Sequence, residues 1–352
     1  MYADLLEALR WQRPFADAER PRAALRRQAW RRFEQFTHRF EAERGGQARR
    51  ILARLRSLPE DRQDSVIASP QGFYAASRSC PTDTSHAYFE GAVTVEEILA
   101  GESPESASSP CWSALGDQAY AYIRGRGWSL EFSATRLAGF LPVDSQCPAT
   151  RNEIPGMASI SAPVSKAEEL GILDRLTGTI GLIKAGSATT LQLFRDFARV
   201  IVARELLEER TFQACGARIT PGRIVVNNVL GAADDECIAD ALVHEAIHCA
   251  IDHCELEQPI VTELNVEARI QSPWSGRWLD LNTFVQACYV WYGLANFWDQ
   301  VGRRPDLRSE GGSAMLAQAR RGFEISDPVS ALDPHKRVLN PAVIDAMQGM
   351  RA

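Results

Sequence analysis

The sequence predicts an α+β protein that is predominantly α-helical. Apolar residues recur at helical intervals over most of residues 1–57 and 166–213. Residues 223–229 instead form a β-branched run behind a Thr-Pro-Gly turn, a pattern typical of a strand. Residues 236–253 follow that strand without any Pro or Gly, which favours a long helix. We therefore expect an α-rich N-terminal region and, later, a helix preceded by a short strand or hairpin.

Length and composition leave the domain organisation open. The 352 residues can form one extended unit or two lobes. We divide the chain into regions 1–150 and 151–352, which form either separate domains or one continuous unit. A net charge of -6 argues against a general nucleic-acid binder. No run of 18 apolar residues predicts a membrane span, and the N-terminus lacks the features of a signal peptide. We expect a cytoplasmic protein with no membrane partner.

The N-terminal region is rich in arginine, with 14 Arg between positions 10 and 56. Three interpretations stay open for them. They form a solvated helix face whose aliphatic stems cover apolar surface, a docking surface for an acidic peptide, or a contact for nucleic acid. Residues 58–165 are less regular, and we expect a short helix, a Ser/Pro-rich loop at 102–110 and short strands there.

The stretch 236–253 contains His244-Glu245-Ala246-Ile247-His248, an HExxH motif. On a helix, residues four apart lie one above the other, about 6 Å along the axis. The two imidazoles can therefore take neighbouring positions on one metal ion, and Glu245 can reach a metal-bound water. The alternative is a buried helix with two ordinary histidines. The motif makes 151–352 the candidate metal-binding catalytic region.

A third protein ligand is usual in a catalytic metal site. Glu267 lies 19 residues after His248, the interval used by metallopeptidases whose third ligand is a Glu on a following helix. Glu263 would lie one turn earlier on the same face of that expected helix. Both carboxylates could equally be solvated. The strand at 223–229 could hold an extended peptide along a sheet edge, as in zinc peptidases, or be purely structural.

Residues 272–298 combine a loop, SPWSGR, with an aromatic helix that starts at Asp280 or Thr283. An aromatic stripe at helical spacing belongs to the core or lines a binding site. Trp274 and Gln286 are our candidates for residues of a substrate pocket.

Three segments together carry a family resemblance: LVHEAIH (242–248), SPWSGR (272–277) and FVQACYVWYGLANFW (284–298). This combination resembles the HExxH-type 2-oxoglutarate-dependent peptide β-hydroxylases. The resemblance covers residues 220–300 closely, and the N-terminal half only in general character.

The resemblance implies a reaction other than proteolysis. Fe(II) would be held by His244, His248 and Glu267, a ligand set that suits non-haem iron. The cosubstrate 2-oxoglutarate would take two more positions, and a side-chain β-carbon of a peptide would be hydroxylated with O₂. Glu245 would then hold water near the metal. The distal carboxylate of 2-oxoglutarate needs a cation, for which Arg277 and then Arg269 are the candidates.

One position departs from the family pattern, in which a His is common where this chain has Gln286. An amide neither carries a proton nor readily binds iron, so we favour a pocket role there over a ligand role. Three functions remain in view. The first is the Fe(II)/2-oxoglutarate hydroxylase, the second a zinc metallopeptidase with Glu245 as general base, and the third a non-catalytic, metal-stabilised peptide-binding protein.

Overall fold

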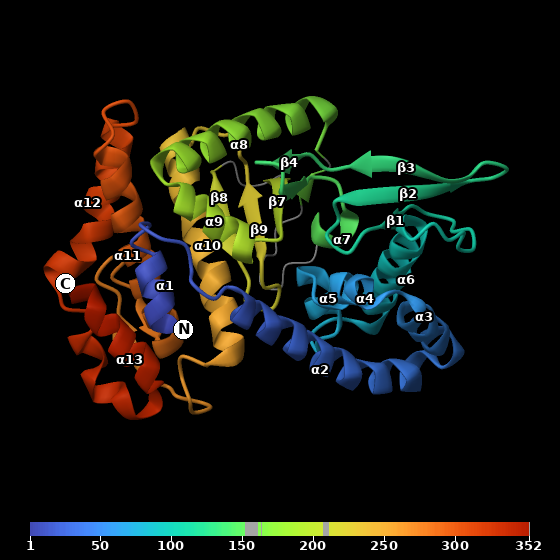
Figure 1. Ribbon diagram of the computed structural model, residues 1–352, viewed down its shortest axis with the longest axis horizontal. Helices are drawn as coiled ribbons and strands as arrows, with labels where there is room; N and C mark the ends of the chain where they lie inside the picture. Colours follow the sequence, from blue (N-terminus) through green and yellow to red (C-terminus); the bar gives the residue numbers. More distant parts are fainter. Residues whose placement is uncertain (152–160, 163, 207–210, 352) are drawn as a thin grey trace. The chain divides into compact units, whose positions relative to one another are not determined.

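Helices dominate the fold of the chain. A computed structural model describes residues 1–151, 161, 162, 164–206 and 211–351 (Figure 1). Helix accounts for 57% and strand for 14% of the structure, which confirms the predicted α+β class. None of the described helices is long and apolar enough to cross a membrane.

The chain divides into two compact units that are discontinuous in sequence. Unit 1 comprises residues 1–24, 174–198 and 232–352, and unit 2 comprises residues 25–173 and 199–231. This division differs from the contiguous boundary that we expected near residue 150. Two helices, α2 (Glu19–Arg44) and α8 (Lys166–Gly186), have residues in both units.

Unit 1 consists mainly of helices and contains the HExxH motif. Its elements are α1 (Tyr2–Ala8), α9 (Ala188–Phe197), α10 (Asp235–Glu257), β10 (Arg269–Gln271), β11 (Trp278–Asp280), α11 (Leu281–Gly302), α12 (Glu310–Ile325), η1 (Ser330–Val338), α13 (Pro341–Gln348) and η2 (Gly349–Arg351).

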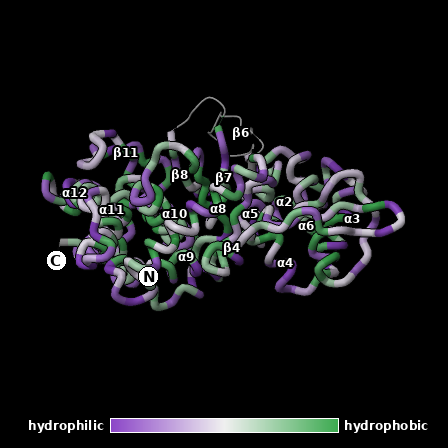
Figure 2. The backbone as a smooth tube through the Cα atoms, turned by 90° about the horizontal axis from the view of Figure 1, so that it is seen from above, coloured by the Kyte–Doolittle hydropathy of each residue, from purple (hydrophilic) through white to green (hydrophobic). Residues whose placement is uncertain are grey.

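Helix α10 carries the motif and is buried along most of its length. It begins at the N-cap Asp234, whose side chain accepts a hydrogen bond from the backbone N–H of Cys237 at 2.7 Å. The predicted apolar stripe is confirmed, because Ile238, Leu242, Ile247 and Ile251 are all fully buried. Figure 2 shows hydrophobic residues along both α10 and α11.

Helix α11 lies close against α10 beside the motif. Its N-cap is Asp280, which accepts a hydrogen bond from the backbone N–H of Thr283 at 3.0 Å. A Cβ on Gly293 would lie 2.6 Å from Cδ1 of Ile247. The glycine therefore permits the close approach of the two helices.

The helix expected near Glu263 and Glu267 is absent from the described structure, and that expectation was wrong. The segment after α10 is irregular and leads into the antiparallel hairpin β10–β11. Its backbone pairs with a distant part of the chain, since the N–H of Thr262 donates to the carbonyl of Val338 at 2.9 Å. Leu264 is 92% exposed, so the segment has no apolar stripe to bury as a helix.

Unit 2 contains both larger sheets. The six-stranded sheet is mixed, in the order β4-β5-β7-β9-β8 with β6 also paired to β7, and the second sheet has the order β1-β2-β3. The strands are β1 (Cys111–Trp112), β2 (Gln118–Ile123), β3 (Gly127–Ser133), β4 (Arg136–Leu137), β5 (Leu141–Asp144), β6 (Ser161–Ala162), β7 (Val200–Leu206), β8 (Gln213–Gly216) and β9 (Arg223–Asn227). The helices within unit 2 are α3 (Gly46–Ser57), α4 (Glu60–Ile67), α5 (Pro70–Ala75), α6 (Thr82–Leu99) and α7 (Pro148–Arg151).

Strand β7 corrects a second expectation, that 166–213 is helical throughout. The helical spacing holds for α8 and α9, but Val200–Leu206 forms a strand between parallel β5 and β9. Val200, Ile201 and Val202 are β-branched and buried on both faces of the sheet, which favours a central parallel strand.

Strand β9 matches the predicted strand and ends at Asn227. It pairs with β7 on one side and with β8 on the other. The strand before the HExxH helix is therefore not a sheet edge, and it cannot itself hold an added peptide strand.

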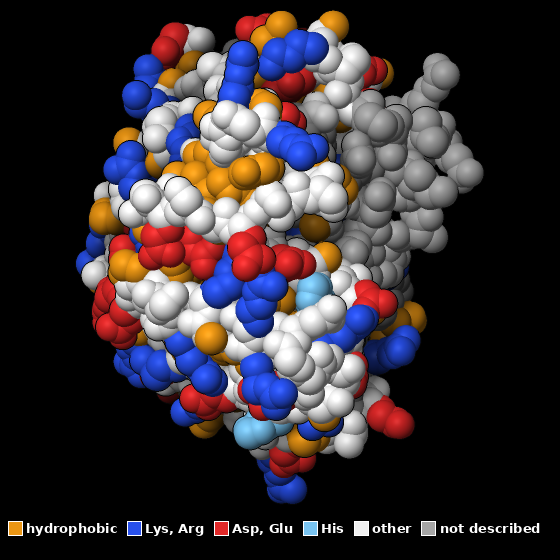
Figure 3. Space-filling model, turned by 90° about the vertical axis from the view of Figure 1, so that its right-hand side faces the viewer, with side chains coloured by type: hydrophobic (Ala, Val, Ile, Leu, Met, Phe, Trp, Pro, Cys, Tyr) orange, Lys and Arg blue, Asp and Glu red, His pale blue; other side chains and the backbone are white. Residues whose placement is uncertain are grey.

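Several arginines of unit 2 take part in ion pairs with acidic residues. Arg54 donates through Nε to Oε1 of Glu97 at 2.8 Å, and Arg62 lies 2.8 Å from Glu96. On the face shown in Figure 3, Lys and Arg side chains are interspersed with Asp and Glu. This arrangement agrees with a solvated face of mixed charge.

Candidate metal centre

The two histidines of the motif point the same ring nitrogen at each other. Nε2 of His244 and Nε2 of His248 lie 3.2 Å apart, and the ring centroids are 4.9 Å apart. Helix α10 produces this convergence, because side chains at i and i+4 project from one face of a helix. Both histidines are partly buried.

This separation fits two ligands of one metal ion. Two nitrogens, each about 2.0–2.1 Å from a zinc ion at a tetrahedral angle, would be roughly 3.3 Å apart. A right angle between the same bonds, as in octahedral coordination, would give roughly 3.0 Å. The observed 3.2 Å lies between these values. The two histidines therefore fit two neighbouring positions on one metal ion.

Both histidines are held in the neutral form that metal binding requires. Burial, together with the smaller effect of the neighbouring imidazole of His248, lowers the pKa of His244 to about 3. Burial also lowers the pKa of His248, against the opposing effect of a hydrogen bond to Gln286. Neutral imidazoles at pH 7 offer a nitrogen lone pair to a metal without first losing a proton.

Gln286 contacts the second ring nitrogen of His248, the one that faces away from His244. Its Oε1 lies 2.9 Å from Nδ1 of His248. Its Nε2 donates to Oε2 of Glu255 at 2.9 Å and to Oδ1 of Asn282 at 3.0 Å. Asn282 in turn donates through Nδ2 to Oε1 of Glu255. A metal-binding histidine commonly has such a partner on its second nitrogen, where it fixes the ring orientation.

An aromatic wall, formed by Trp291, Trp274 and Phe323, extends from His244. Trp291 of α11 meets the His244 ring edge to face, at 6.3 Å between centroids, and stacks on Trp274 at 5.8 Å with an interplanar angle of 11°. Trp274 is also in edge contact with Phe323 at 5.0 Å and donates through Nε1 to the carbonyl of Ala319 at 2.9 Å. The wall places a rigid apolar surface beside the histidine pair.

The predicted third ligands do not join the histidines. Glu263 and Glu267 are both exposed. Within the residues that the structure describes, no group of three or more His, Cys, Asp or Glu side chains could hold a metal ion. The spacing argument had assumed a helix at 262–270, and the hairpin there removes the basis for it.

The other predicted site residues lie in unit 1 in different environments. Glu245 is 6% exposed, next to His244 on α10. Arg269 and Arg277 are exposed on the β10–β11 hairpin and on the turn between its strands. Trp274, in the same turn, contacts Trp291, whereas Gln286 is nearly buried and contacts His248.

Sequence reasoning missed Glu255 and Asn282. Glu255 is seven residues after His248, which places it two turns further along the same face of α10. Asn282 precedes Gln286 by one turn of α11. The available signal was a polar pair seven residues apart on α10 and another four residues apart on α11. Only packing shows that the two helices present these pairs to each other.

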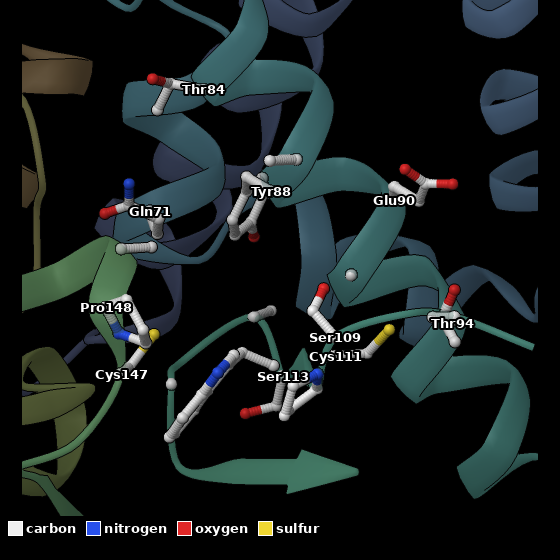
Figure 4. A pocket seen from close by; sticks show the side chains of 18 of the residues that line it. Gln71, Thr84, Tyr88, Glu90, Thr94, Ser109, Cys111, Ser113, Cys147 and Pro148 are labelled. Atoms are coloured by element: carbon white, nitrogen blue, oxygen red, sulfur yellow. The ribbon is translucent and has the colours of Figure 1, made fainter. Parts of the chain in front are cut away.

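A cavity of about 1020 Å³ lies in unit 2 and is lined by residues between Arg50 and Thr150 (Figure 4). At its wall, Oε1 of Gln71 accepts a hydrogen bond from Arg223 at 2.9 Å, while Nε2 of Gln71 has no hydrogen-bond partner among the described residues. The cavity contains neither histidine of the HExxH motif. We therefore treat it as separate from the candidate metal centre.

Comparison with known proteins adds no assignment. No protein-family model matches the chain, and no curated protein matches it.

Proposed function

We propose that the protein is an Fe(II)- and 2-oxoglutarate-dependent oxygenase that hydroxylates a side-chain β-carbon of a peptide. The observation that carries this proposal is the 3.2 Å convergence of the His244 and His248 Nε2 atoms beside an aromatic wall. The resemblance of the HExxH, SPWSGR and aromatic segments to peptide β-hydroxylases supports it.

Coordination number does not separate iron from zinc at this site. A catalytic zinc ion usually takes three protein ligands and a water in tetrahedral geometry. An octahedral Fe(II) has six positions, of which a chelating 2-oxo acid takes two and O₂ one. Either metal therefore has three positions for protein ligands, of which the two histidines fill two. Glu267 remains a candidate third ligand only if its segment rearranges when metal binds.

The chain's own residues have distinct parts in this proposal. His244 and His248 hold the metal, which supplies the activation of O₂ when it is bound. Glu245 orients water near the metal, and the wall formed by Trp291, Trp274 and Phe323 limits solvent on one side. Arg277 or Arg269 pairs with the distal carboxylate of 2-oxoglutarate, since a carboxylate removed from water needs a cation.

A zinc metallopeptidase with Glu245 as base is the second candidate, because the motif permits it. The position of β9 weakens this reading, since both of its edges are already paired within its sheet. A non-catalytic, metal-stabilised peptide-binding protein is the third candidate.

Anaerobic spectroscopy tests the proposal without a known peptide. Protein loaded with Fe(II) should develop the weak visible charge-transfer band of a chelated 2-oxo acid when 2-oxoglutarate is added, and His248→Ala should not. Glu245→Gln should retain the band. Protein that binds zinc, gives no band and cuts peptides in a Glu245-dependent way would establish the peptidase instead, since a general base supplies about 10²–10⁴-fold in rate.

A further inference from the structure

The hydrogen bonds around His248 determine which of its nitrogens carries a proton. We propose that Gln286, oriented by Glu255 and Asn282, is a positioning residue that fixes His248 as the Nδ1–H tautomer. We also propose that His244 must change tautomer when metal binds. The inference about metal rests on the proposed function, whereas the inference about the metal-free tautomers does not.

The orientation of the Gln286 amide follows from its partners. Its Nε2 lies within 3.0 Å of two acceptors, the Glu255 carboxylate and Oδ1 of Asn282. The reversed amide would place Oε1 against both acceptors, with no hydrogen between them. Asn282 is oriented in the same way, because its Nδ2 faces the other oxygen of Glu255. The three side chains are hydrogen-bonded to one another, and each amide can take only one orientation.

The tautomer of His248 follows from that orientation. Oε1 of Gln286 is an acceptor and lies 2.9 Å from Nδ1, so Nδ1 must carry the proton. In a neutral ring Nε2 then has the lone pair. This nitrogen faces the neighbouring histidine, so His248 is already prepared as a metal ligand in the metal-free protein.

The tautomer of His244 in the metal-free protein is the opposite one. Two lone pairs facing each other at 3.2 Å would repel, whereas a proton on Nε2 of His244 makes this contact a hydrogen bond to Nε2 of His248. In the metal-free site the two Nε2 atoms therefore satisfy each other. The acceptor on Gln286 sets the state of both rings, although it contacts only one of them.

Metal binding then requires a proton to move on His244. The proton leaves Nε2, Nδ1 takes up a proton from water, and the ring stays neutral with its lone pair toward the metal. No net charge is lost from the ring. We infer that His248 already has the tautomer that binds metal, whereas His244 must change its tautomer first. The hydrogen bond between the two histidines therefore competes with metal binding.

Nitrogen NMR of protein labelled with ¹⁵N in histidine distinguishes these states, because each tautomer has its own pattern of ring-nitrogen shifts. The chain has six histidines, and spectra of His244→Ala and His248→Ala assign the pair. Metal-free wild type should show Nδ1–H for His248 and Nε2–H for His244. Diamagnetic Zn(II) should convert His244 to Nδ1–H and leave His248 as Nδ1–H.

Gln286→Met tests the positioning role, since methionine keeps the length of the side chain but has no amide acceptor. The Nε2–H tautomer of His248 should become populated, and Zn(II) affinity should fall by about 10–100-fold. Gln300→Met is the matched control on the same helix, where the amide donates to the carbonyl of Arg10. It should leave both tautomers and the affinity unchanged.

A proton on Nε2 of His248 in metal-free wild type would overturn the inference, and so would an unchanged His248 tautomer in folded Gln286→Met. The wild-type spectrum decides the matter even if that variant does not fold. Failure of the protein to bind Zn(II) or Fe(II) would contradict the proposed function but not the metal-free tautomers. Metal binding with the wrong tautomers would contradict only this inference.

Discussion

The indole of Trp291 meets the imidazole of His244 edge to face, with ring centroids 6.3 Å apart and planes at 87°. The contact joins α11 to the HExxH helix within unit 1. It places a fluorophore against the ring of His244, whose Nε2 faces that of His248.

We expect Trp291 to report metal binding through its fluorescence. Paramagnetic Co(II) or Ni(II) at the histidine pair should quench part of the tryptophan emission, and Zn(II) should quench it much less. Trp291→Phe should lose most of the response, whereas Trp128→Phe, in unit 2, should keep it. An equal response in both variants would place the metal away from His244.

Removal of either motif histidine should abolish metal binding. We expect His244→Ala and His248→Ala to lower Zn(II) affinity by at least about 100-fold, because each removes a direct ligand. Glu263→Ala and Glu267→Ala should change it little, since both carboxylates are exposed and the structure does not gather them with the histidines. Isothermal titration calorimetry with Zn(II) measures the affinity of each of the four variants. A large loss in Glu267→Ala would mean that the segment around it moves to the metal.

Gly322 of α12 is required by the packing of Trp274. A Cβ at this position would lie 2.1 Å from Cε2 of the indole, so Gly322→Ala must displace the ring from the aromatic wall. We expect a loss of about 1–3 kcal/mol in the free energy of unfolding. Gly178→Ala in α8 is the matched control, because its Cβ would meet nothing within 4 Å, and it should stabilise by about 0.5–1 kcal/mol. Denaturant unfolding measures the change in the free energy of unfolding for each variant. A change of the same sign in both variants would contradict the packing argument.

Asp240 should make the folded state less stable as pH rises from 4 to 6. Burial raises the pKa of Asp240 to about 6, while the hydrogen bond from Nε1 of Trp298 at 2.7 Å acts in the opposite direction. Between its unfolded and folded pKa values the folded protein binds more protons than the unfolded chain, so stability falls with rising pH.

Asp240→Asn keeps an oxygen for Trp298 and removes the ionisation. We expect it to be more stable than wild type at pH 7 by about 1–3 kcal/mol, after allowance for partial solvent screening, and nearly equal at pH 4. Asp345→Asn, an exposed position, is the control and should show no such difference between the two pH values. A stability gain in Asp240→Asn that is the same at both pH values would contradict this account.

Local sequence determined the HExxH helix and the convergence of its histidines. Asp234 caps α10, no Pro or Gly interrupts it, and its apolar stripe is buried as expected. The distance between Nε2 of His244 and Nε2 of His248 then follows from side chains one helical turn apart. These features depend on interactions within a few residues, which a sequence displays directly.

Tertiary structure decided the rest. Val200–Leu206 has apolar residues that suit helix or strand, and pairing with β5 and β9 selects the strand. Thr262 bonds to Val338, which prevents the helix that would have aligned Glu263 with Glu267. Gln286 and Glu255 meet His248 only because α11 packs against α10, a contact between residues that are far apart in the chain. A sequence pattern identifies the ligands, but the partners that orient them are selected by packing between elements.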